Sequence, residues 1–228
     1  MTAEATFWLT VLSQVQKFFI LVGVVIFMTM PKLGKQQYLE LGIILWLSLL
    51  TELTTLIVIR VFHTNPNAYG NVYAMIELPL VVLLYRRFVG WKNKNAISLL
   101  IIMPFVLFGL FNILKNGIHH INSYTLFLAS ICVIIISIAY FYVLIQELPT
   151  ESITKLPMFW INTAFLIYHS GNFFLYLSAD YLITVLDHSL INPWMFHNFL
   201  GLIFYAILWY AMFLIRAENL KTRDNIPI

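Results

Sequence analysis

Four titratable side chains lie inside long apolar segments of this 228-residue chain, where such groups are rare. They are Lys17, Glu52, Glu77 and His169. An ionisable residue at the centre of a membrane helix costs about 2.5–3.5 kcal/mol on insertion scales, so it normally faces a partner, a water-filled cavity or a ligand. An ammonium and two carboxylates can form ion pairs, take up a proton or hold a cationic or hydrogen-bonding ligand.

The simplest interpretation of these groups is structural. Lys17 can pair with Glu52 or Glu77 and fix the register of the helices without any ligand. His169 then serves as a hydrogen-bonded core histidine, and Asn162 as a packing residue. One lysine facing two glutamates nevertheless leaves one carboxylate over. That carboxylate must be protonated, bind a cation or contribute to a site for a cationic or hydrogen-bonding ligand.

The composition is that of a membrane protein. Hydrophobic residues make up 61% of the chain and charged residues 10%, with a mean hydropathy of +0.86, whereas soluble domains carry about 25% charged residues. The net charge of +3 is too small to indicate nucleic acid as a partner. The single cysteine, Cys132, excludes an internal disulfide. The expected environment is therefore the lipid bilayer.

Seven apolar runs have the length that crosses a membrane. About 20 residues at 1.5 Å rise span a hydrocarbon layer about 30 Å thick. The chain is thus predicted to be all-α, a polytopic membrane bundle of seven transmembrane helices that forms one domain over residues 1–228. We expect spans at about residues 6–30, 38–59, 70–88, 96–114, 121–146, 156–179 and 189–215.

Basic residues collect in alternate connections between these spans. Only Arg60 and Lys115 lie on one side. The other side has ten basic residues: Lys32, Lys35, Arg86, Arg87, Lys92, Lys94, Lys155, Arg216, Lys221 and Arg223. Because Lys and Arg are retained on the cytoplasmic side, the sequence predicts an N-terminus outside and a C-terminus in the cytoplasm.

The intramembrane polar groups share the outer half of the bilayer in this topology. Counted along each helix, the four titratable groups lie roughly 10–16 Å from the outer ends of their spans. Helical spacing adds three inward stripes: Ser48 with Glu52, Tyr73 with Glu77, and His197 with Gly201 and Tyr205. We predict an outward-facing ligand-binding pocket formed by Lys17, Glu52, Asn71, Tyr73, Glu77, His169, Asn172, His197 and Asn198.

Short motifs point to a sensory role. The segments Pro157–Ile161, Gly171–Phe174 and Asn71–Glu77, together with Tyr168, resemble uncharacterised bacterial seven-span membrane proteins similar to the input modules of sensor kinases. The resemblance implies a receptor-like protein in the bacterial cytoplasmic membrane that binds a small molecule from outside. About a dozen residues follow the last span, so we expect the signal to pass to a separate cytoplasmic or membrane partner.

Two other functions fit parts of the pattern. The intramembrane carboxylates and a possible three-plus-one-plus-three duplication suit a small solute transporter or proton-coupled carrier. An intramembrane metal-dependent hydrolase is the third alternative, with His169, His197 and Glu77 as ligands and base. No HExxH pair supports the hydrolase, and no catalytic residue, resident metal or cofactor is predicted. A retinal sensor is excluded because residues 189–215 contain no lysine.

Overall fold

The protein is all-α. The computed structural model describes residues 3–147, 152–184 and 191–224, and is 88% helical. Short π-helical and 3₁₀ segments cover Val58–Phe62 and Ile153–Lys155. Within the described ranges the α-helices are α1 (Ala3–Met28), α2 (Lys32–Gln37), α3 (Leu39–Ile57), α4 (Asn67–Tyr85), α5 (Lys94–Asn116), α6 (Ser123–Glu147), α7 (Pro157–Thr184) and α8 (Ile191–Asp224).

Each predicted span falls on one long helix, and six of these helices are long and apolar enough to cross a membrane. They are α1, α3, α4, α5, α6 and α8. Helix α7 is 28 residues long, but it is not among the six and carries the polar residues Asn162, His169 and Asn172. Two details differ from expectation: the short α2 was not predicted, and α8 runs nine residues beyond position 215. The class of integral membrane protein is supported, while the seventh span and the orientation stay predictions.

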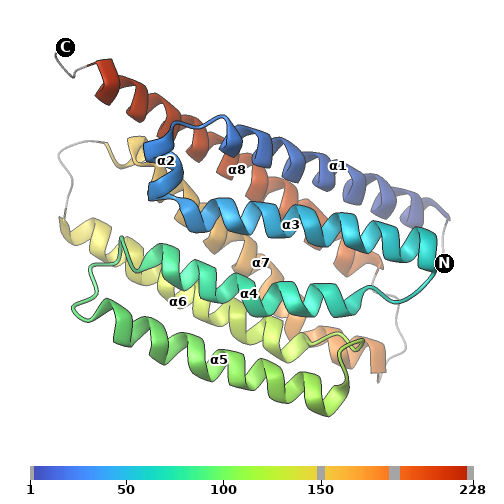
Figure 1. The fold of residues 1–228 in the computed structure, drawn as a ribbon. Coiled ribbons are helices and arrows are strands. Elements are labelled where there is room, and N and C mark those ends of the chain that lie inside the picture. Colours follow the sequence, from blue (N-terminus) through green and yellow to red (C-terminus); the bar gives the residue numbers. More distant parts are fainter. Residues whose placement is uncertain (1–2, 148–151, 185–190, 225–228) are drawn as a thin grey trace.

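The contacts between long helices arrange six of them in a ring, and α5 lies at one edge of the bundle beside α4 and α6 (Figure 1). Around the ring, α1 packs on α3, α3 on α4, α4 on α6, α6 on α7, α7 on α8, and α8 returns to α1. Helix α5 covers the outside of α4 and α6. The ring therefore surrounds a common axis along which inward side chains of six helices can meet.

Turn residues set where the helices end. Gly117, at φ +86°, follows α5, and Gly90, at φ +64°, follows α4; such left-handed backbone suits glycine because it has no Cβ. His63 is also left-handed, at φ +51°, just after the π-helical turn. The Asn93 side chain accepts a hydrogen bond from the Ala96 N–H and caps the start of α5.

The outer surface of the bundle is apolar. Large hydrophobic side chains on α5 face outward, including Leu100 at 74% exposure and Leu114 at 85%. Phe174 and Phe213 on α7 and α8 are also exposed. Water-soluble monomers rarely expose continuous apolar surface on this scale. This surface is suited to contact with lipid.

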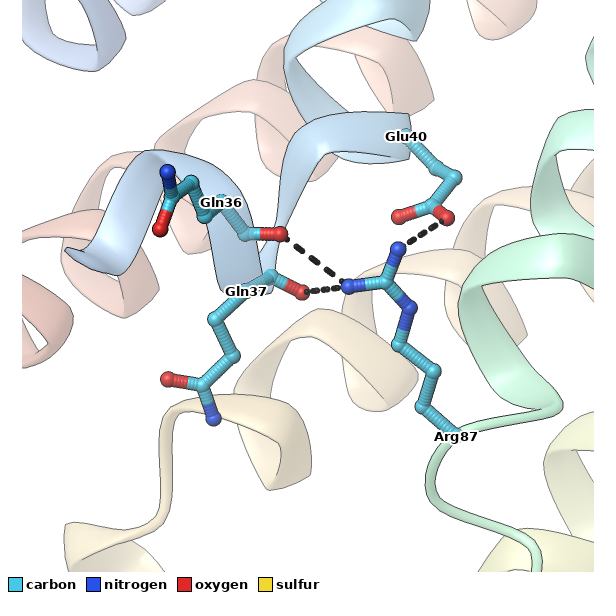
Figure 2. Close-up of polar contacts among 4 residues, drawn as sticks. All are labelled: Gln36, Gln37, Glu40 and Arg87. Atoms are coloured by element: carbon cyan, nitrogen blue, oxygen red, sulfur yellow. Dashed lines mark hydrogen bonds and ion pairs between the residues drawn. The ribbon is translucent and has the colours of Figure 1, made fainter. Parts of the chain in front are cut away.

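One end of the bundle is fixed by a partly buried ion pair (Figure 2). The Arg87 guanidinium, just after α4, lies 2.6 Å from a carboxylate oxygen of Glu40 in α3. It also donates to the carbonyls of Gln36 and Gln37 at 3.1 and 3.0 Å, the last residues of α2. Arginine thus satisfies free carbonyls at a helix C-terminus and a buried carboxylate together. We call this end of the molecule the Arg87 end.

The opposite end is fixed by asparagine amides. Asn71, on α4, donates to the carbonyls of Ile118 and His120 at 2.7 Å each and accepts from the Asn122 N–H at 3.1 Å. Asn67 adds a bond to the His119 carbonyl at 3.1 Å. These bonds tie the α5–α6 connection to the first turns of α4. We call this end the Asn71 end.

The Arg87–Glu40 pair makes a measurable contribution to stability. Arg87→Met leaves the Glu40 carboxylate, 8% exposed, without its cation, and should lower the free energy of unfolding by about 1–3 kcal/mol. The expected loss is smaller than the loss of about 3–5 kcal/mol for breaking a fully buried pair, because the Arg87 side chain is 35% exposed. Unfolding in detergent measures the loss, and Arg87→Met with Glu40→Gln should recover part of it. Lys92→Met, at an exposed site, is the control; equal stability of Arg87→Met and this control contradicts the role of the pair.

Candidate ligand-binding cavity

A cavity of about 200 Å³ lies toward the Asn71 end of the ring. All six ring helices contribute to it, whereas α5 contributes no lining residue. The lining residues are Gln16, Ile20, Ser48, Thr51, Glu52, Asn67, Gly70, Asn71, Tyr73, Glu77, Ile121, Leu126, Tyr168, Tyr176, Trp194, His197 and Tyr205. The lining includes members of all three predicted stripes, so each stripe contributes to the same cavity. These members are Ser48, Glu52, Tyr73, Glu77, His197 and Tyr205.

Glu77 is held in place by a chain of hydroxyl groups. The Tyr73 hydroxyl donates to Glu77 Oε1 at 3.0 Å, one helical turn away on α4. Ser48 Oγ, on α3, lies 2.9 Å from the same tyrosine oxygen and donates to the Ile44 carbonyl. Because the tyrosine gives its single proton to the carboxylate, its contact with Ser48 relies on the serine proton, which is shared with the Ile44 carbonyl. The predicted proximity of Tyr73 and Glu77 is confirmed.

Lys17 pairs with Glu52 and not with Glu77. Its Nζ lies 3.7 Å from Glu52 Oε2 and donates to Ser13 Oγ at 2.8 Å. The pair joins α1 to α3, as the structural interpretation expected. Glu52 lines the cavity but Lys17 does not. Among the described residues, Lys17 lies beside Glu52 and no lysine or arginine lines the cavity, so Glu77 has no cation beside it there.

His197 joins the cavity to α7. Its Nδ1 lies 2.9 Å from Asn172 Oδ1 and 3.4 Å from the Tyr176 hydroxyl. Asn172 donates its Nδ2 to the Tyr168 carbonyl at 2.9 Å, so its oxygen faces the histidine. Asn172 is fully buried behind the cavity and does not line it. Its role is to position His197.

His169 does not reach the cavity. The ring is 3% exposed, its Nδ1 lies 3.3 Å from Ser130 Oγ on α6, and its plane is parallel to that of Phe165. Its Nε2 is buried without a hydrogen-bond partner. The expectation that His169 shares a pocket with Glu77 and Glu52 is therefore wrong: it lies among α6 and α7 core residues.

Two further predicted site residues have other surroundings. Asn71 lines the cavity, but its amide is already committed to the α5–α6 connection by three hydrogen bonds. Asn198 is half-buried and is not a lining residue. The alternative metal site, formed by His169, His197 and Glu77, is not supported. Among the described residues, no group of three or more His, Cys, Asp or Glu side chains lies close enough together to hold an ion.

Several lining residues were not in the predicted pocket. Gln16 is buried next to Lys17, and the aromatic lining includes Tyr168, Tyr176 and Trp194. Gln16 was detectable as an amide beside Lys17 within a long apolar segment. The aromatic residues were not, because tyrosine and tryptophan near span ends equally indicate an interfacial belt.

A second polar cluster closes the ring below the cavity. Tyr85, on α4, donates to Asn162 Oδ1 at 2.6 Å and lies 3.2 Å from Ser137 Oγ, and Asn162 donates to the Ser137 carbonyl at 3.3 Å. All three residues are fully buried. Asn162 is thus a hydrogen-bonded junction of α4, α6 and α7 as well as a packing residue. This Tyr85 junction, with the buried Phe165 and Leu208, fills the ring toward the Arg87 end.

No known protein family, curated protein or solved structure matches the chain. The chemistry of the cavity must therefore be derived from its own residues.

Gly201 provides space for Gln16 in the cavity wall. A Cβ at this position would collide with Gln16 Nε2 and lie 2.8 Å from its Cδ. We expect Gly201→Ala to push the flexible glutamine side chain into the cavity while the helices stay in place. Labelling of a Thr51→Cys reporter in a Cys132→Ala background should slow severalfold. Leu100→Ala, on the outward face of α5 and away from the cavity, is the control; equal slowing in both variants contradicts this packing.

Proposed function

We propose that the chain is a seven-span, receptor-like membrane protein that binds a small ligand from the non-cytoplasmic side and signals through a separate partner. The observation that carries the proposal is the cavity on the ring axis, lined by six helices and holding a carboxylate without a cation. A ligand there lies among side chains from all six ring helices. Binding can therefore favour one arrangement of the helices over another.

The seven-span topology is supported by where α7 buries its polar groups. Asn162 and Asn172 are fully buried and His169 is 3% exposed, so these side chains face the bundle. Polar residues in membrane helices normally face the bundle interior. The outward residues of the same helix include Phe174 and Leu177. Helix α7 is thus suited to cross the bilayer as part of the ring despite its lower hydropathy.

The orientation is supported by charge. Lys32, Lys35, Arg86, Arg87 and Lys92 all lie in connections at the Arg87 end. Retention of Lys and Arg in the cytoplasm places this end inside. The Asn71 end, with the cavity, then faces outward.

A receptor fits the described packing better than a carrier does. A transporter must open its site to each side in turn. Here the Tyr85 junction and the apolar layer around Phe165 fill the ring on the cytoplasmic side of the cavity. Rearranging this layer would break three hydrogen bonds among fully buried groups, Tyr85, Ser137 and Asn162. The arrangement favours a ligand that enters and leaves by one side.

Sided cysteine labelling tests this proposal. In a Cys132→Ala background, a membrane-impermeant maleimide should label Thr51→Cys from outside intact cells and not from the cytoplasmic side of inverted vesicles. Lys92→Cys should show the reverse pattern, and lipid-facing Leu100→Cys should label from neither side. Labelling of Thr51→Cys from the cytoplasmic side would overturn the orientation. Absence of labelling from both sides would overturn an accessible cavity.

A further inference from the structure

The charge of Glu77 is not balanced by any side chain in the cavity. Among the described residues, Lys17 pairs with Glu52 and Arg87 pairs with Glu40. The cavity lining contains no lysine or arginine. The group that Glu77 contacts, the Tyr73 hydroxyl, is a neutral donor. The lining thus offers a carboxylate at a depth where a counter-charge is expected.

Aromatic rings form a large part of the cavity lining. Tyr73, Tyr168, Tyr176, Trp194 and Tyr205 all line it, from three helices. Trp194 and Tyr168 lie 5.0 and 5.7 Å from the His197 ring, centroid to centroid. Tyrosine and tryptophan faces attract cations, and aromatic cages are a common way to bind ammonium groups. The faces of the same rings carry partial negative charge and would repel an anion.

His197 adds an acceptor to this lining. Because Asn172 presents its carbonyl oxygen, His197 Nδ1 must be the donor in their 2.9 Å contact. In the neutral imidazole, Nε2 is then left as an acceptor. The lining therefore provides Glu77, one histidine nitrogen and several tyrosine oxygens as places for a donor-bearing cation.

We propose that the cavity binds a small organic cation, a primary amine or quaternary ammonium compound, with its charge toward Glu77 and its carbon substituents among the tyrosines and Trp194. This inference rests on the proposed function. The volume of about 200 Å³ lies below the roughly 300–1,000 Å³ of pockets for drug-sized ligands, so the ligand is small. A bare divalent ion is a poorer occupant, since hard cations take about six or more oxygen ligands and no group of three suitable acidic or histidine side chains converges here.

A neutral isostere separates charge from shape. Choline, 3,3-dimethylbutan-1-ol and 3,3-dimethylbutanoate are similar in size but are cationic, neutral and anionic. Each is tested, together with methylammonium, for protection of Thr51→Cys against maleimide in purified protein. We expect a cation to protect at a concentration at least about tenfold lower than the neutral alcohol, which is the effect of one charge-assisted contact. The anion should not protect.

Glu77→Gln identifies the residue responsible. It keeps the shape of the side chain and should abolish the difference between choline or methylammonium and the neutral alcohol. Glu4→Gln, an exposed acid at the same end of the bundle, should leave the difference unchanged. The inference is overturned if the cation and the alcohol protect equally, or if the anion protects better. It is also overturned if Glu77→Gln still prefers the cation to the alcohol. Absence of protection by every probe while Thr51→Cys labels from outside overturns it too, and this result leaves the accessible cavity of the proposed function intact.

Discussion

Helices α1 and α8, at opposite ends of the chain, pack along each other and close six helices into a ring. The Trp209 indole donates to the Phe19 carbonyl at 3.1 Å and stacks on the Phe19 ring at 4.3 Å. Two glycines permit the close approach, since a Cβ at Gly23 would lie 3.2 Å from Trp209 Nε1 and one at Gly201 would collide with Gln16. Without this contact, the polar faces of α1, α3 and α8 would not meet on one axis. The cavity depends on the closure.

Closure also determines how the buried polar groups divide. Those at the Arg87 end and in the Tyr85 junction bond to one another, with 2.6 Å contacts from Arg87 to Glu40 and from Tyr85 to Asn162, so their role is to hold helices together. Those at the Asn71 end are divided. The Asn71 amide is fully used by the neighbouring connection, whereas Glu77 keeps one hydroxyl partner and faces open volume. A ligand gains most binding free energy from a polar group that lies beside a cavity and that packing leaves incompletely paired.

The sequence predicted the helices better than the site. Apolar runs and turn residues located all seven long helices, because hydropathy and helix length are local properties. The spacing of Tyr73 with Glu77 placed both correctly, since residues four apart share a helix face. Helix rotation is not local: His169 and His197 lie at similar depths, yet one faces α6 and the other the cavity. The Arg87–Glu40 pair was missed for a different reason. A basic residue just after a span is interpreted first as a topology signal.

A cross-link between α1 and α8 tests most directly whether these two helices close the ring. Gln16→Cys with Gly201→Cys, in a Cys132→Ala background, places two thiols on the faces of α1 and α8 that meet where the end of the glutamine side chain contacts the glycine. A short bifunctional thiol cross-linker in native membranes, followed by mass spectrometry, should yield a peptide pair linked within one chain. The same pair should not form when the two substitutions are on separate, co-expressed chains. Failure of the intramolecular link to form, while both thiols react singly with the reagent, would show that α1 and α8 do not meet there and would contradict closure of the ring.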